Sequence, residues 1–185
     1  PNLGAAYGSE TQKTILPTDE MSAETLNGYK EFSQSIKKTS KAPNVMREND
    51  PFTKPLTQNL WVFGGNNPLS KRIKTQLNQY GIEFKKSGLT VDKINYQWES
   101  HSFIFTLDDY KSKDNQVTWV IANSKKSIPG LIRKLPHYGK YGYLVFKGDE
   151  PENVAKGTWP SSNTGLSHTF EKGTYSLPSK ISWVK

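Results

Sequence analysis

The stretch from residue 60 to residue 84 constrains the fold most, because it changes from strand to helix and back without a break. Its first four residues, LWVF, form an apolar run that is typical of a strand covered on both faces. Glycines and asparagines follow, and Pro68 fits the first position of a helix. Apolar residues then recur at helical spacing until Gly81, and residues 82–84 predict a second strand. A strand, a helix and a strand in this order build parallel sheets.

The rest of the central region continues this alternation. Strands are predicted at 88–98, 102–107, 117–124 and 141–146, a short helix at 127–135, and a charged loop at 108–116. Together these segments predict a three-layer α/β domain with a mostly parallel sheet, spanning residues 56–160.

The two ends of the chain are predicted to lie outside this domain. Residues 1–55 are expected to form an extension, with a loop over 1–17, one helix, and a surface connection over 37–58. That helix has a cap-like Thr18, is weakened by Gly28, and places apolar residues at Met21, Leu26, Tyr29, Phe32 and Ile36. Residues 161–185 predict a loop-rich tail with a hairpin, whose apolar end at 181–184 docks on the body.

Composition narrows the range of functions. Lysine and arginine total 25 against 17 acidic residues, a net charge of +8 that favours acidic partners. There is no cysteine, and therefore no disulfide framework. No apolar run approaches the ~18 residues of a membrane span, so no span is expected. Because the chain lacks an initiator methionine, we expect a piece of a longer protein.

The residues give little support for a metal site or for a catalytic nucleophile. The histidines, His101, His137 and His168, are far apart and none lies in an HExxH helix, so no metal site or cofactor is predicted for this chain. There is no GxSxG turn. The acid pairs at 108–109 and 149–150 are predicted to be solvated in loops.

The turn at 64–68 has the position of a phosphate-binding loop, between a strand and a helix. It lacks the third glycine of the dinucleotide pattern and the GK[ST] ending of the nucleotide pattern. Tight turning is therefore the preferred explanation of its glycines.

The segment LIRKLPHYGKYGYLVFKGDEP, residues 131–151, mixes aromatic and basic side chains. Such side chains can stack on rings while lysines meet negative charge, yet they also suit a stiff helix-to-strand connection, which we favour. The predicted binding residues are Arg133, His137, Tyr138, Lys140, Tyr141 and Tyr143. No catalytic residue is predicted.

The longer stretch IPGLIRKLPHYGKYGYLVFKGDEPENVAKGTWP resembles the C-terminal region of bacterial gluzincin zinc aminopeptidases of the alanyl-aminopeptidase-like family. There the pattern runs close to GLxRKLPHYGKYSYLxFxGxxPxNxxKGxW, and Gly142 stands where that pattern has serine. The likeness extends over residues 60–159. It implies that zinc and catalysis belong to a separate domain of a parent hydrolase, and that this chain is a non-catalytic accessory or interaction domain.

Three functional hypotheses follow. In the first, the accessory domain contacts the catalytic domain of the same or a parent peptidase, in the periplasm or cell envelope. In the second, the net charge and the aromatic residues among lysines serve a polyanion, either nucleic acid or acidic glycan, or an acidic protein. In the third, the chain is an enzyme in which His137, Lys140 and Tyr141 act as acid, base and anion-stabilising groups at the strand ends.

Overall fold

The computed structural model describes residues 1–9, 12–17, 21–36, 44–45, 56–65, 67, 69–109 and 112–160. Helices are α1 (Leu3–Gly8), α2 (Ala23–Ser35), α3 (Ser70–Gln79) and α4 (Ile128–Lys134), with 3-10 turns η1 (Lys125–Ser127) and η2 (Leu135–Tyr138). A seven-stranded sheet contains β1 (Gln12–Leu16), β2 (Asn44–Val45), β3 (Asn59–Phe63), β7 (His101–Asp109), β8 (Ser112–Ile121), β9 (Tyr143–Lys147) and β10 (Glu152–Gly157). A three-stranded sheet contains β4 (Glu83–Lys85), β5 (Gly88–Val91) and β6 (Ile94–Gln97).

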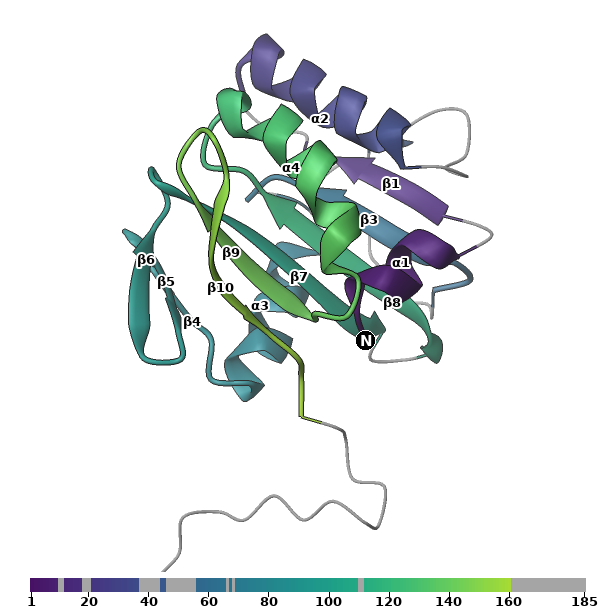
Figure 1. The fold of residues 1–185 in the computed structure, drawn as a ribbon. Helices are drawn as coiled ribbons and strands as arrows, with labels where there is room; N and C mark the ends of the chain where they lie inside the picture. The colour runs from purple at the N-terminus through teal and green to yellow at the C-terminus, as the bar shows by residue number, and fades with distance from the viewer. Residues whose placement is uncertain are drawn as a thin grey trace, which may run out of the picture.

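The large sheet has the strand order β10-β9-β7-β8-β3-β1-β2. The strands β2, β1, β3 and β8 are parallel, whereas β7 runs antiparallel to β8 and β9, and β10 antiparallel to β9. Helices α1, α2 and α4 cover one face, and α3 with the small sheet covers the other (Figure 1). The predicted three-layer α/β architecture is confirmed.

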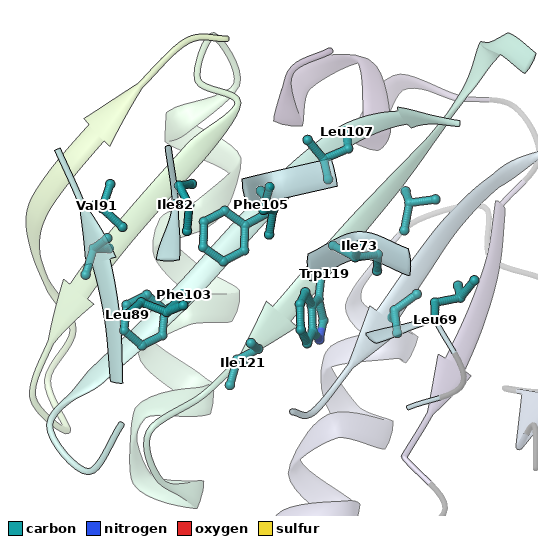
Figure 2. Packing of buried hydrophobic residues seen from close by; sticks show 14 of the residues in the cluster. Leu69, Ile73, Ile82, Leu89, Val91, Phe103, Phe105, Leu107, Trp119 and Ile121 are labelled. Atoms are coloured by element: carbon teal, nitrogen blue, oxygen red, sulfur yellow. The ribbon is translucent and has the colours of Figure 1, made fainter. Parts of the chain in front are cut away.

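Each face of the large sheet has its own apolar core, because successive residues of a strand point to opposite faces. On β3, Trp61 and Phe63 pack with α2 and α4, while Leu60 and Val62 pack with α3. Ile82, Leu89 and Val91 of the small sheet and its approach lie near Phe103 and Phe105 of β7 (Figure 2). The small sheet therefore covers this second core.

The strand β4 does not pair with β3, so the predicted parallel strand, helix and strand unit is wrong. Both neighbours of β3 are already present, namely β1 and β8. The residues Glu83 and Lys85 of β4 are exposed, and their charges would be buried at an interior position of the large sheet. The chain after α3 instead starts the small antiparallel sheet.

The loop predicted over residues 1–17 is also wrong, because this segment forms α1 and β1. Asn2 caps α1 by accepting a hydrogen bond from the backbone N–H of Ala5 at 2.9 Å. Thr14 of β1 is polar and buried, and its hydroxyl is satisfied by a hydrogen bond that Ser33 of α2 donates to it at 2.9 Å. Since β1 lies between β2 and β3, the predicted boundary at residue 55 runs through one sheet.

The helix predicted near residues 18–36 is confirmed as α2, but its cap is Ser22, which accepts from the N–H of Thr25 at 3.2 Å. Thr18 lies outside the described residues. Gly28 suits this helix because a methyl group there would lie 2.7 Å from Cδ1 of Ile128 on α4. The glycine thus allows α2 and α4 to approach closely.

The remaining predictions about secondary structure differ in outcome. The single strand predicted over 88–98 is two strands, β5 and β6, which reverse at Asp92 and Lys93 with positive φ of 50° and 68°. Most of the loop predicted over 108–116 is strand, since β7 ends at Asp109 after a bulge and β8 starts at Ser112. Pro68, most of the connection over 37–58, and the tail with its hairpin at 161–185 lie outside the described residues.

Candidate functional site

The segment predicted to bind a partner is a fixed connection between α4 and β9. The helix α4 continues directly into η2, and a turn leads to β9. Helix α1 holds this turn through two backbone bonds, from Leu3 N to Tyr141 O at 2.9 Å and from Gly4 N to Gly139 O at 2.7 Å. Segments far apart in the sequence therefore rigidify each other.

Within the stretch that resembles the aminopeptidase pattern, several residues contact one another. Lys134 donates a hydrogen bond to the carbonyl of Pro151, and a methyl group on Gly130 would overlap the Pro151 ring. Asn153 donates to the carbonyls of Val145 and Ala155, at 3.1 and 2.9 Å. These positions hold α4, β9 and β10 together, which explains their residue types by packing.

Gly142 illustrates the same close packing. A methyl group there would lie 2.5 Å from Nε1 of Trp159, whose N–H donates to the carbonyl of Thr106 at 2.6 Å. The serine that the resemblance expects at this position would require the indole of Trp159 to move. Glycine and tryptophan therefore fit each other here.

The structure separates Tyr143 from the other predicted binding tyrosines. Its ring lies on the α3 side of the large sheet, 5.3 Å from the ring of Trp159. Its hydroxyl donates to Oδ2 of Asp92 at 2.5 Å. Burial, followed by the hydrogen bond and negative charge of Asp92, raises the pKa of Tyr143 to about 12. Tyr143 thus joins the small sheet to β9.

Two tyrosines and two lysines do come together on the opposite face, and we call them the tyrosine–lysine surface: Tyr138, Lys140, Tyr141 and Lys156. The Tyr138 and Tyr141 ring centroids are 6.1 Å apart. Lys140 Nζ lies 5.2 Å from the Tyr141 centroid, and Lys156 Nζ lies 5.7 and 5.3 Å from Tyr138 and Tyr141. Both lysines are exposed, while both tyrosines are half-buried. The packing of an edge strand brings in Lys156, which the site prediction did not include.

The last two predicted binding residues lie at the margin of this surface. His137 is exposed on η2. Arg133 is also exposed and faces Glu150 at 3.5 Å. Among the contacts described for this part of the chain, none joins His137 to Lys140 or Tyr141.

In each pair of adjacent acidic residues, at 108–109 and at 149–150, the two side chains have different surroundings. Asp109 is buried in an ion pair with Arg72, whereas the side chain of its neighbour Asp108 is 38% exposed. Asp149 accepts a hydrogen bond from Ser124 at 2.6 Å, while Glu150 faces Arg133. The sequence correctly predicts solvent exposure for 149 and 150 but misses the burial of Asp109.

A groove of about 390 Å³ lies on the other face, and the sequence did not reveal it. Its walls come from α3, from β4, from the turn between β6 and β7, and from the end of β8. The aromatic lining consists of Phe84, Trp98 and Trp119, and Lys74 and Lys85 flank these rings. Only the fold brings these residues together, since they are spread over 46 positions of the chain from 74 to 119.

The turn after β3 contributes to this groove through Gly65. Gly64 adopts a positive φ of 84°, and its carbonyl accepts from Trp119 Nε1 at 2.7 Å and from Asn67 Nδ2 at 3.0 Å. The side chain of Asn67 also accepts from the N–H of Leu69 at 2.9 Å. These bonds support the preferred explanation that the glycines form a tight turn.

Other signatures of function are absent from the described residues. That part of the chain contains no group of three or more histidine, cysteine, aspartate or glutamate side chains that could hold a metal ion. None of the helices described is long and apolar enough to cross a membrane. No family model matches the sequence, and no curated protein matches it.

Proposed function

We propose that this chain is a non-catalytic interaction module, an accessory part of a bacterial zinc metallopeptidase, which contacts the catalytic domain through the tyrosine–lysine surface. The observation that supports this proposal is a division among the residues of the aminopeptidase-like stretch. Gly130, Pro151 and Trp159 pack in the interior of the fold. The side chains of Lys140 and Lys156 are exposed and lie over tyrosine rings.

The surface has properties that favour protein recognition. Tyr138 packs edge-on against buried Phe146, with ring centroids 5.4 Å apart, so its side chain is already ordered before a partner binds. Ordered tyrosines lose little conformational entropy on binding, which is one reason why they recur in interfaces. The ammonium groups of Lys140 and Lys156 select a partner surface that carries carboxylates.

A binding titration tests this function. We expect the reading frame around this segment to encode a zinc domain with an HExxH helix, and the titration uses that domain. The double variant Lys140→Glu, Lys156→Glu should weaken binding by at least about tenfold, because it reverses two charges at the contact. The matched control is Lys126→Glu, an exposed lysine that pairs with Asp149 at 3.8 Å away from this surface.

The proposal fails if the double variant binds as tightly as the parent chain, or if the reading frame lacks such a zinc domain. It also fails if the isolated chain, freed of contaminants, binds stoichiometric zinc and cleaves an aminoacyl reporter substrate. That result would place the catalytic function in this chain.

A second candidate, a polyanion-binding module, is favoured by the net charge of +8 and by the lysines that lie over tyrosine rings. Bases or sugars would stack on the rings while phosphate or sulfate groups meet the lysines. Titration with single-stranded DNA and with heparin at two salt concentrations tests it, because counterion release makes phosphate-driven binding fall steeply with salt. Absence of binding at low salt would exclude this candidate.

A further inference from the structure

The aromatic groove on the α3 face lies where the chain leaves two neighbouring parallel strands. The strands β3 and β8 pair in parallel, so that their carboxyl ends meet at one edge of the sheet. After β3 the chain crosses to α3 on one face, and after β8 it crosses to α4 on the opposite face. Open α/β sheets bind ligands in the crevice that such divergent connections leave. Gly65 and Ile121, which follow and end these strands, both line the groove.

The groove offers ring faces that are already fixed in place. Phe84 is nearly parallel to Trp119, with an interplanar angle of 14° and centroids 5.9 Å apart, and lies 6.2 Å from Trp98. The indole N–H of Trp98 donates to the carbonyl of Lys85 at 3.2 Å, and that of Trp119 donates to the carbonyl of Gly64. Trp119 is fully buried and supports the floor of the groove, while the half-buried rings of Phe84 and Trp98 offer apolar surface to a ligand.

The charge of the lining is positive. Lys74 Nζ lies 5.3 Å from the centroid of the Phe84 ring, and Lys85 Nζ donates a hydrogen bond to Oδ1 of Asn95 at 3.1 Å. The described residues that line the groove include these two lysines and no carboxylate. Glu83 is 3.9 Å from Lys85 but its side chain is 68% exposed, so solvent screens it.

We propose that this groove binds a small ligand that combines a planar aromatic ring with an anionic substituent, as a mononucleotide or an aromatic carboxylate does. The ring lies against Phe84 and Trp98, and the anion is placed between Lys74 and Lys85. The volume of about 390 Å³ suits one such molecule, because ligand pockets commonly measure ~300–1,000 Å³. This site is independent of the tyrosine–lysine surface, which lies on the other face of the sheet.

The test follows the indole N–H signals of Trp98 and Trp119 by NMR while the chain is titrated with AMP, adenosine, indole-3-acetate and inorganic phosphate. AMP or indole-3-acetate should shift both signals with saturation. Adenosine and phosphate should each bind at least about tenfold more weakly, because each lacks one half of the recognised chemistry. A response to AMP alone assigns a nucleotide, and a response to indole-3-acetate alone assigns an aromatic carboxylate.

Two variants separate the roles of charge and ring. The double variant Lys74→Gln, Lys85→Gln should weaken the ligand that binds by at least about tenfold, and Phe84→Leu should do so while the lysines remain. Lys126→Gln, on the opposite face, should leave binding unchanged, and circular dichroism checks that each variant folds. The proposal is overturned if neither AMP nor indole-3-acetate shifts the signals at millimolar concentration, or if the double lysine variant binds as the parent does.

Discussion

Gly130 packs directly against the ring of Pro151: a methyl group built on its Cα would lie 3.0 Å from Cγ of the proline and nearer still to Cδ. Gly130→Ala should therefore destabilise the fold, although alanine favours a helix by ~1 kcal/mol over glycine. Overpacking costs ~1–3 kcal/mol, and we expect a net loss of about 1 kcal/mol in the free energy of unfolding. Urea denaturation measures this loss.

Gly8→Ala is the matched control for that substitution. It also lies in a helix, α1, but a methyl group there meets nothing within 4 Å. We expect this variant to be as stable as the parent chain or slightly more so. Equal stability of both alanine variants would contradict the close contact at Pro151.

Tyr143 should make stability depend on alkaline pH. Burial and the nearby Asp92 carboxylate raise its pKa from 10.0 to about 12 in the folded state. Between these values the unfolded chain releases the tyrosine proton and the folded chain keeps it, so stability is intact below pH 10 and falls as the pH rises toward 12. Tyr143→Phe should make this fall shallower, as measured by thermal unfolding across that range.

The charge of Asp92 can be tested separately. Asp92→Asn keeps an oxygen that accepts the bond from Tyr143 but removes the negative charge, so the pKa of Tyr143 should move down toward its usual value. Because burial is the larger cause, the shift should be only partial. Ultraviolet titration of tyrosinate in the parent chain, in this variant and in Tyr143→Phe measures the shift in the pKa of Tyr143. An unchanged titration would contradict the proximity of the two groups.

The buried carboxylate of Asp109 should be important for stability. Its side chain is fully buried, where it pairs with Arg72 and accepts from the N–H of Leu56 at 2.8 Å. Asp109→Ala removes both interactions, and removal of one partner from a buried pair costs ~3 kcal/mol or more. The neighbouring variant Asp108→Ala should change the unfolding free energy by less than ~0.5 kcal/mol. Similar losses in the two variants would contradict this difference.

The turn between β5 and β6 should be improved by glycine. Lys93 has a φ of 68°, a left-handed conformation that costs a side-chain-bearing residue ~1 kcal/mol. Lys93→Gly removes this strain and should raise the melting temperature, since glycine is the preferred residue at such turn positions. Lys86→Gly, in the preceding turn where φ is not positive, should lower it. Calorimetry of both variants measures these changes in melting temperature.

The sequence predicted the elements whose apolar periodicity is local. Strand β3, helix α3 and the glycine that ends it follow from residues 60–81 alone, because each signal lies within a few positions of the next. Strand β1 was missed because its buried Gln12 and Thr14 look like loop residues. Their partners, Tyr7 and Ser33, belong to other elements, so the hydrogen bonds that permit burial are visible only in the fold.

The same difference between local signals and contacts made only in the fold applies to the two candidate sites. The tyrosines and Lys140 of one surface are close in sequence and were predicted together, but Lys156 joins them through the pairing of β9 and β10. Tyr143 was assigned to that surface although alternation along a strand can place neighbours on opposite faces. The groove was invisible because Phe84 and Trp119 stack across two different sheets.

The interior position of β1 affects how this protein can be shortened. Residues 60–63 of β3 are all buried, and β1 covers their backbone on one side. A chain that began at residue 56 would leave this apolar strand as a new, unprotected edge. Exposed apolar edges pair with other molecules, so such a truncation should aggregate rather than form a smaller domain.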